Sequence, residues 1–141
     1  MPSLVEQLIL HEGLKTRVYR CPAGKWTIGV GRNLEDKGIS KEEALHLLHN
    51  DVKEVDRSLR DRYEWFDELD FVRQKVCVDM AFNLGIGGFS QFKNMIRAIE
   101  QKDYVKASEE MKDSAWYRQV GVRGKRLVEM MRTGEDYKEV I

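Results

Sequence analysis

The feature that most limits the fold is a run of apolar residues at helical spacing after Ser40. Ser40 and Glu43 form a capping-box pattern, in which a serine hydroxyl and a glutamate carboxylate satisfy backbone N–H groups at a helix start. The apolar residues that follow lie three or four apart and so share one helix face: Ala44, Leu48, Val52, Val55 and Leu59. We therefore expect a helix of about twenty residues, ending at Arg60 or Tyr63 and long enough to bridge two lobes.

A second capping box stands near the start of the chain. Ser3 and Glu6 have the same spacing, and they precede a short apolar stripe made of Leu4, Val5, Leu8 and Ile9. Gly13 is expected to end this helix. Glu12 then occupies the last helical turn, where the helix dipole disfavours a negative charge.

The residues from 18 to 32 show a different pattern. They are rich in strand-forming types, and the turn signal Pro22-Ala23-Gly24 divides them, so we predict a small β-hairpin with two or three strands. Gly29 and Gly31 alternate with apolar residues, which is typical of a strand that another backbone or a ligand approaches closely on one face.

The rest of the chain favours helices, at residues 67–84, 91–99, 103–113 and 123–132. Glycines at 85, 87 and 88 mark the end of the first of these segments. The expected fold is therefore α+β and mainly helical, with one small sheet near the N-terminus.

Composition excludes several classes of protein. The chain has 141 residues, of which 42% are hydrophobic, enough for one domain with a core. Its 24 basic and 24 acidic residues cancel, so no net charge draws it to nucleic acid or to an anionic membrane. Two cysteines make neither a disulfide framework nor a zinc motif, and we expect no metal and no cofactor.

Three residues are candidates for chemistry, although each also has an ordinary interpretation. Glu12 can be a solvated carboxylate or part of a salt bridge at a helix end. Cys21 can be a small apolar residue in a turn, and Thr27 a plain strand residue. Taken separately, none of the three indicates an enzyme.

Taken together and in order, they resemble the T4-lysozyme-like family of phage-type lysozymes, or endolysins. The resemblance begins with Glu12-Gly13 and the segment 19–31, which holds Cys21 and Thr27 at the family's spacing. It continues through the glycine-containing segment 82–89 and the C-terminal segments 114–119 and 123–134. It therefore covers nearly the whole chain.

The resemblance implies a muramidase that hydrolyses the β-1,4 bond between N-acetylmuramic acid and N-acetylglucosamine in peptidoglycan. It implies a T4-lysozyme-like fold of two lobes with the glycan bound between them. The single domain, residues 1–141, would comprise a β lobe at about 14–40, a connecting helix at about 41–62, and a helical lobe at 63–141 that also includes the first helix, 3–12. The expected partner is the glycan strand alone, bound by a monomer without stable membrane association.

The resemblance also implies catalytic roles. Glu12 would be the general acid, and the hydroxyl of Thr27 would orient the attacking water. Cys21 stands where the family usually has aspartate, so we expect it at the second catalytic position. A free thiol, with a pKa of about 8.5, is mostly neutral at pH 7. Lys25 or Arg20 could lower that pKa, and a thiolate could act as a base or as a nucleophile, which leaves inversion and retention both open.

Substrate-binding residues are expected in the second half of the chain. Phe82 and Asn83 match a stretch that lines the family's cleft, although Phe82 could equally be an ordinary core residue. Arg123 is the expected ion-pair partner of Glu12, or else a generic helix arginine. Arg32 is expected to pair with Asp51, and Cys77 to be a buried core thiol.

Two other functions remain possible from the sequence. A wall peptidase or amidase would use Cys21 as nucleophile with a nearby base, for which His11 is closest along the chain. A non-catalytic peptidoglycan-binding module would lack the chemistry altogether.

The first residues have no basic segment, and Glu6 and Gln7 interrupt their apolar run, which does not fit a signal peptide. We expect synthesis in the host cytoplasm and release to the wall through a separate membrane pore.

Overall fold

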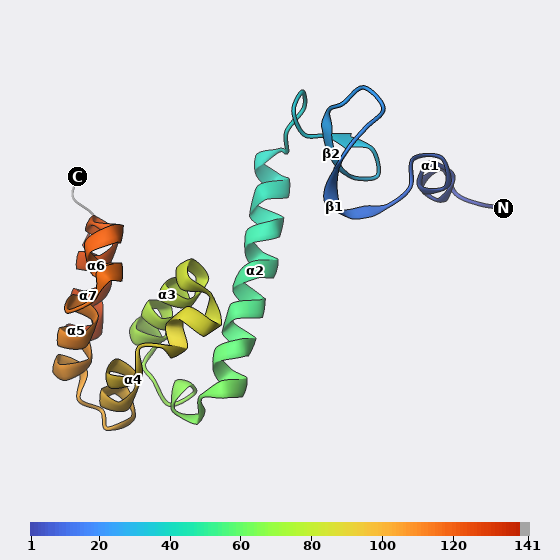
Figure 1. Ribbon diagram of the computed structural model, residues 1–141. Helices are drawn as coiled ribbons and strands as arrows, with labels where there is room; N and C mark the ends of the chain where they lie inside the picture. The colour runs from blue at the N-terminus through green and yellow to red at the C-terminus, as the bar shows by residue number, and fades with distance from the viewer. Residues whose placement is uncertain (139–141) are drawn as a thin grey trace. The chain divides into compact units, whose positions relative to one another are not determined.

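The computed structural model describes residues 1–138, which form helices and one small antiparallel sheet (Figure 1). The predicted mainly helical α+β fold is thus confirmed. Contacts divide the chain into two compact units, one of residues 1–47 and one that begins at Leu48. The long helix α2 (Lys41–Arg62) belongs to both. Within residues 1–138, no helix combines the length and the apolar character needed to cross a membrane.

The first unit opens with helix α1 (Leu4–Glu12). The Ser3 hydroxyl accepts a hydrogen bond of 3.1 Å from the backbone N–H of Glu6, as the capping pattern predicts. The helix ends at Gly13, whose φ of 77° lies in the left-handed region that favours glycine. Glu12 is therefore the last residue of the helix, as expected.

The sheet of the first unit has three strands, β1 (Lys15–Arg20), β2 (Trp26–Gly29) and β3 (Arg32–Asn33), in that order and antiparallel. The central strand carries Thr27, which pairs with Tyr19 on one side and with Asn33 on the other. Strand β1 begins before the predicted start at residue 18, because backbone pairing extends through exposed polar residues. The register shifts between Lys15 and Tyr19.

Helix α2 begins as its capping box predicts. The backbone N–H of Glu43 donates to the Ser40 hydroxyl at 3.0 Å, and the backbone N–H of Ser40 donates to the Glu43 carboxylate at 2.9 Å. Arg32 adds a 2.8 Å bond to the same carboxylate, so the expected pairing of Arg32 with Asp51 is wrong. The Arg32 guanidinium, together with the Ser40 cap, lowers the pKa of Glu43 to about 2. The capping box holds the Glu43 carboxylate at the start of α2, and there Arg32 of strand β3 can bind it.

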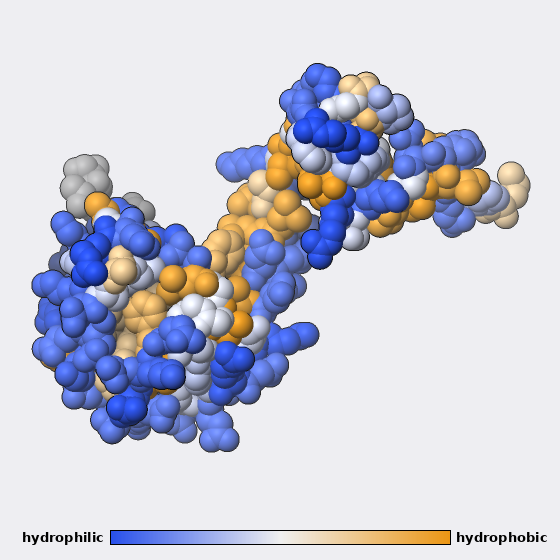
Figure 2. Space-filling model, viewed as in Figure 1, coloured by the Kyte–Doolittle hydropathy of each residue, from blue (hydrophilic) through white to orange (hydrophobic). Residues whose placement is uncertain are grey.

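The apolar face of α2 is largely uncovered. Of its 22 residues only Leu59 is buried. Leu45, Leu48 and Val52 are exposed, and Figure 2 shows hydrophobic surface along this helix.

The second unit contains the hydrophobic core. Besides the C-terminal part of α2 and a 3-10 turn at Glu64–Phe66, its residues up to 138 form five helices: α3 (Phe71–Ser90), α4 (Lys93–Glu100), α5 (Tyr104–Lys112), α6 (Ala115–Val120) and α7 (Val122–Thr133). Helix α5 packs against α4 and α7, and α7 also packs against α3. Core side chains with no exposed surface come from α2, the 3-10 turn, α3, α5 and α7, among them Leu59, Phe66, Met80, Phe89, Met111 and Met131.

Helix α3 differs from the prediction at both ends, and one further helix was not predicted. Helix α3 begins at Phe71 and not at 67, because the Asp70 carboxylate caps it by accepting from the backbone N–H of Arg73 at 3.1 Å. Its predicted end at residue 84 is in fact a kink at Gly85, where φ is 78°, and the helix resumes beyond it. Helix α6 was not predicted, since six residues are too few to show a periodic pattern.

Candidate active site

The carboxylate of Glu12 lies against the sheet of the first unit. Its contact is Gly31, in the turn between β2 and β3. A β-carbon built on Gly31 would lie only 2.5 Å from Oε2 of Glu12. The close approach expected at these glycines is found at Gly31, but the approaching group is a side chain and not the expected backbone or ligand. The expectation is wrong at Gly29, which has no other atom within 4 Å of such a β-carbon.

Thr27 lies in the middle of the same sheet. Only 2% of its surface is exposed. Its hydroxyl donates a 2.9 Å hydrogen bond to the carbonyl oxygen of Lys25. Pairing on both sides fixes the backbone of Thr27, and this bond fixes its hydroxyl.

Cys21 lies in the turn between β1 and β2. Its backbone N–H donates to the Lys25 carbonyl at 2.9 Å, and its carbonyl accepts from the Gly24 N–H at 2.8 Å. The thiol is partly exposed. Hydrogen bonding by the backbone of Lys25 lowers the pKa of the Cys21 thiol. The Ala23 backbone and the Thr27 hydroxyl lower that pKa further, while burial acts against them.

The expectation that a neighbouring positive charge would lower this pKa is therefore wrong. The Lys25 ammonium pairs with Asp36 at 3.5 Å, and the Arg20 guanidinium stacks over Trp26, 4.1 Å from the ring centre. Backbone N–H groups of the tight turn act on the thiol instead. Because Thr27 has one hydroxyl proton, its hydroxyl can donate a hydrogen bond either to the Lys25 carbonyl or to a Cys21 thiolate, but not to both at one time.

The first unit thus holds three groups suited to hydrolysis: a carboxyl at a helix end, a thiol with a lowered pKa, and a buried hydroxyl. Helix α1 supplies Glu12, the turn between β1 and β2 supplies Cys21, and strand β2 supplies Thr27. The contact of Glu12 with Gly31 joins α1 to the turn between β2 and β3. No group of three or more metal-ligating side chains is found within residues 1–138.

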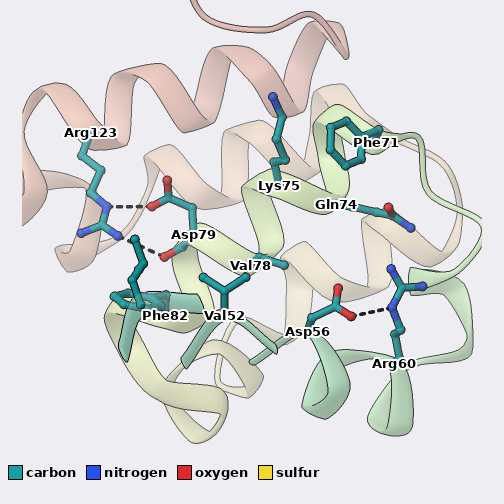
Figure 3. Close-up of a pocket in the computed structure, with 11 residues that line it drawn as sticks. Val52, Asp56, Arg60, Phe71, Gln74, Lys75, Val78, Asp79, Phe82 and Arg123 are labelled. Carbon is teal, nitrogen blue, oxygen red and sulfur yellow. Dashed lines mark hydrogen bonds and ion pairs between the residues drawn. The ribbon is translucent and has the colours of Figure 1, made fainter. Parts of the chain in front are cut away.

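The second unit has a groove of about 510 Å³ beside two of the predicted binding residues, Phe82 and Arg123 (Figure 3). Phe82 is 41% exposed, so it is not an ordinary core residue. Arg123 donates from Nε to the Asp79 carboxylate at 2.7 Å and from Nη2 to the Asp79 carbonyl at 3.2 Å. The ion pair of Arg123 with Glu12 stays a prediction.

The third predicted binding residue, Asn83, is exposed and has a fixed side-chain orientation. Its Oδ1 accepts a 2.9 Å hydrogen bond from the indole N–H of the buried Trp116. The NH₂ group of the Asn83 amide takes no part in this bond, and its two N–H donors can therefore bind a ligand. Trp116 belongs to the unpredicted helix α6, so this support was not foreseen.

Comparison with known sequences now adds to this geometry. The family described as phage lysozyme matches residues 10–133. The chain belongs to the phage lysozyme family. Its membership places it among the lysozymes, which are glycoside hydrolases, and implies peptidoglycan as the substrate.

Individual relatives agree with the family. "Probable T4-type lysozyme 2" of Dictyostelium discoideum is 27% identical, over 96% of this chain and 98% of the relative. The "Pre-baseplate central spike protein Gp5" of Enterobacteria phage T4 is 27% identical over 94% of this chain, which corresponds to 28% of that protein. An "Endolysin" of Acyrthosiphon pisum secondary endosymbiont phage 1 is 29% identical over 71% of this chain and 68% of the relative.

Two residues of this phage lysozyme show what sequence reasoning found and missed. Cys77 was predicted as a core thiol, and it is fully buried, with burial raising its pKa to about 12. Asp79 was missed, since a lone aspartate on a helix carries no signal of its partner 44 residues further along the chain.

Proposed function

We propose that this phage lysozyme is a muramidase, cleaving the β-1,4 bond between N-acetylmuramic acid and N-acetylglucosamine. The observation that carries the proposal is the contact of the Glu12 carboxylate with Gly31, on the sheet that also carries Cys21 and Thr27. Glycoside hydrolysis needs a proton for the leaving oxygen and a second group that acts at the anomeric carbon. A carboxyl that contacts this sheet, whose first turn carries a thiol and whose central strand carries a hydroxyl, offers both.

Glu12 would donate its proton to the glycosidic oxygen as the bond to the anomeric carbon breaks. Thr27 would orient the water through its hydroxyl. Cys21 would occupy the second catalytic position, where its lowered pKa increases the fraction of thiolate. As a base, the thiolate would take a proton from the water while the hydroxyl joins the anomeric carbon. As a nucleophile, it would bond to that carbon first, and water would then replace it.

A cysteine peptidase is poorly supported by the same turn. Such a nucleophile needs a general base within hydrogen-bond reach. The groups that lower the pKa of the Cys21 thiol are the backbone of Lys25 and Ala23 and the Thr27 hydroxyl, and none of these is a base near neutral pH.

The deciding experiment is digestion of purified peptidoglycan by wild type and by Glu12→Gln, with products identified by mass spectrometry. We expect muropeptides with new reducing muramic ends from wild type, and a rate lower by roughly 10²–10⁴-fold in the variant, which lacks the acid proton. Cleaved stem peptides would support a peptidase or amidase instead. The absence of products from both proteins would support a binding module.

Substitution of Cys21 tests the second position separately. We expect Cys21→Ala to lose activity by about 10²-fold or more, and Cys21→Asp to retain most of it, because a carboxylate can also act as base. Proton NMR of the first-released anomer would separate inversion from retention in the wild type. Full activity in Cys21→Ala would remove this residue from the mechanism.

The biological role that we propose is lysis of the bacterial host by a monomer with peptidoglycan as its partner. The similarity to a protein named endolysin supports this role. Expression inside a bacterium should be harmless alone and lytic when a pore-forming membrane protein is co-expressed. Lysis without the pore would contradict release through it.

The assignment of residues 3–12 to the helical lobe stays a prediction.

A further inference from the structure

Two glycines, one at the end of strand β2 and one in the turn that follows it, share one backbone conformation but differ in their surroundings. Gly29 has φ of 70° and Gly31 has φ of 67°, so both lie in the left-handed region that L side chains rarely adopt. Both are also partly buried. A β-carbon on Gly29 would meet no other atom within 4 Å, whereas one on Gly31 would meet Glu12.

The contact at Gly31 involves the reacting end of Glu12. A β-carbon there would lie 2.5 Å from Oε2, 3.1 Å from Cδ and 3.4 Å from Cγ of Glu12. Carbon and oxygen atoms that are not bonded do not approach to 2.5 Å, so a side chain at position 31 and the present carboxylate position exclude each other. The three atoms that are crowded all belong to Glu12.

The crowding would be relieved by the side chain and not by the fold. Glu12 is exposed, it is the last residue of α1, and its side chain is flexible. Backbone pairing holds the turn on both sides, through Ile28 with Arg32 and Thr27 with Asn33. A new methyl group at position 31 would therefore push the carboxylate away from the sheet while the sheet keeps its place.

We propose that Gly31 is a positioning residue for Glu12: the absence of a β-carbon at Gly31 allows the carboxylate to lie against the β2–β3 turn. The catalytic consequence rests on the proposed function, in which Glu12 is the general acid. Displacing a catalytic group by about 1 Å can lower the rate by about 10²-fold, because the proton transfer requires a set distance and direction. Gly31 itself contributes no reacting group.

The test compares Gly31→Ala with Gly29→Ala, which introduces the same strain without the contact. We expect similar losses of thermal stability in both variants. Only Gly31→Ala should lose kcat on purified peptidoglycan, by on the order of 10²-fold, and only in this variant should the shape of the pH–rate profile change. Equal kcat values, or a uniform loss of rate at every pH, would overturn the proposal.

A double-mutant cycle with Glu12→Asp sharpens the result. Aspartate is one methylene shorter, so its carboxylate would stop short of a methyl group at position 31. We expect Gly31→Ala to cost much less kcat in the Glu12→Asp background than in wild type. Independent, multiplicative effects of the two substitutions would show that positions 12 and 31 do not act on each other.

One measurement needs neither activity nor a folded variant. In the wild-type protein, the γ-protons of Glu12 and the α-protons of Gly31 should give a nuclear Overhauser effect. Its absence would overturn the proposal even if Gly31→Ala failed to fold. If the effect is present but wild type releases no muropeptides, the proposed function fails while the contact stands.

Discussion

The two units of the chain are stabilised in different ways. Among residues 1–47, the one buried side chain is the polar Thr27, and hydrogen bonds of turns, caps and strands fix the rest. From Leu48 onward, buried apolar side chains come from helices α2 to α7 and from the 3-10 turn between α2 and α3, and they include Phe66, Met80 and Met131 with no exposed surface. The chemistry proposed for Glu12, Cys21 and Thr27 thus belongs to the unit with fewer buried side chains.

The contrast teaches that fold stability and catalysis depend on separate sets of residues in this chain. Hydrophobic burial is the dominant favourable term in folding, so the helical unit should determine the free energy of unfolding. In the sheet unit, hydrogen bonds set the position and the protonation of side chains, as at Cys21. Substitutions in the two units should therefore affect different measurements.

The largest effect on stability is expected from Phe66→Ala. Phe66 is fully buried, and replacing a buried phenylalanine by alanine costs about 3–5 kcal/mol through lost burial and a cavity. Denaturant unfolding should show this loss, while kcat per folded molecule on peptidoglycan stays near the wild-type value. A large fall in kcat of the folded fraction would show that stability and catalysis do not depend on separate residues in this chain.

An intermediate effect is expected from Thr27→Val, which keeps the volume and removes the hydroxyl. The Thr27 hydrogen bond lowers the pKa of Cys21, so its loss raises that pKa, and a higher pH is then needed to form the thiolate. The rise of kcat/KM with pH should move to higher pH, in addition to any uniform loss from a less well oriented water. In Cys21→Asp this thiol-dependent rise should be missing. An unchanged profile in Thr27→Val would separate Thr27 from the thiol.

The smallest effect is expected from Glu43→Gln at the start of α2. Arg32 and the Ser40 cap lower the pKa of Glu43 to about 2, which is below its value in the unfolded chain. Its contribution to stability is therefore present above the unfolded pKa, near 4.5, and is lost as the pH falls towards about 2. The melting temperatures of wild type and variant should differ slightly at pH 6 and converge near pH 2. A constant difference across this range would exclude the ion pair as its cause.

Features with a local signal were predicted well from the sequence. The capping boxes at Ser3 and Ser40 marked both helix starts, and Gly13 marked the end that carries Glu12. The alternating glycines indicated a close approach that the structure finds at Gly31.

Features that depend on long-range contacts were not predicted. The partner of Arg32 depends on how the chain returns to the start of α2, and that of Arg123 on the packing of α7 against α3. In both cases the decisive contact joins segments whose separation in sequence carries no pattern. Helix α6 was missed for another reason, because its six residues are too few to show a periodic pattern.

The two cysteines of this phage lysozyme differ in a way that bears on inhibitor design. Cys77 is fully buried with its pKa raised to about 12, whereas Cys21 is partly exposed with a lowered pKa. Electrophiles react with thiolates, so an alkylating warhead would select Cys21 over Cys77 in the folded protein. A sugar carrying such a group would make a covalent ligand of the candidate active site, and a fluorescent maleimide would label the same position without engineering of the chain.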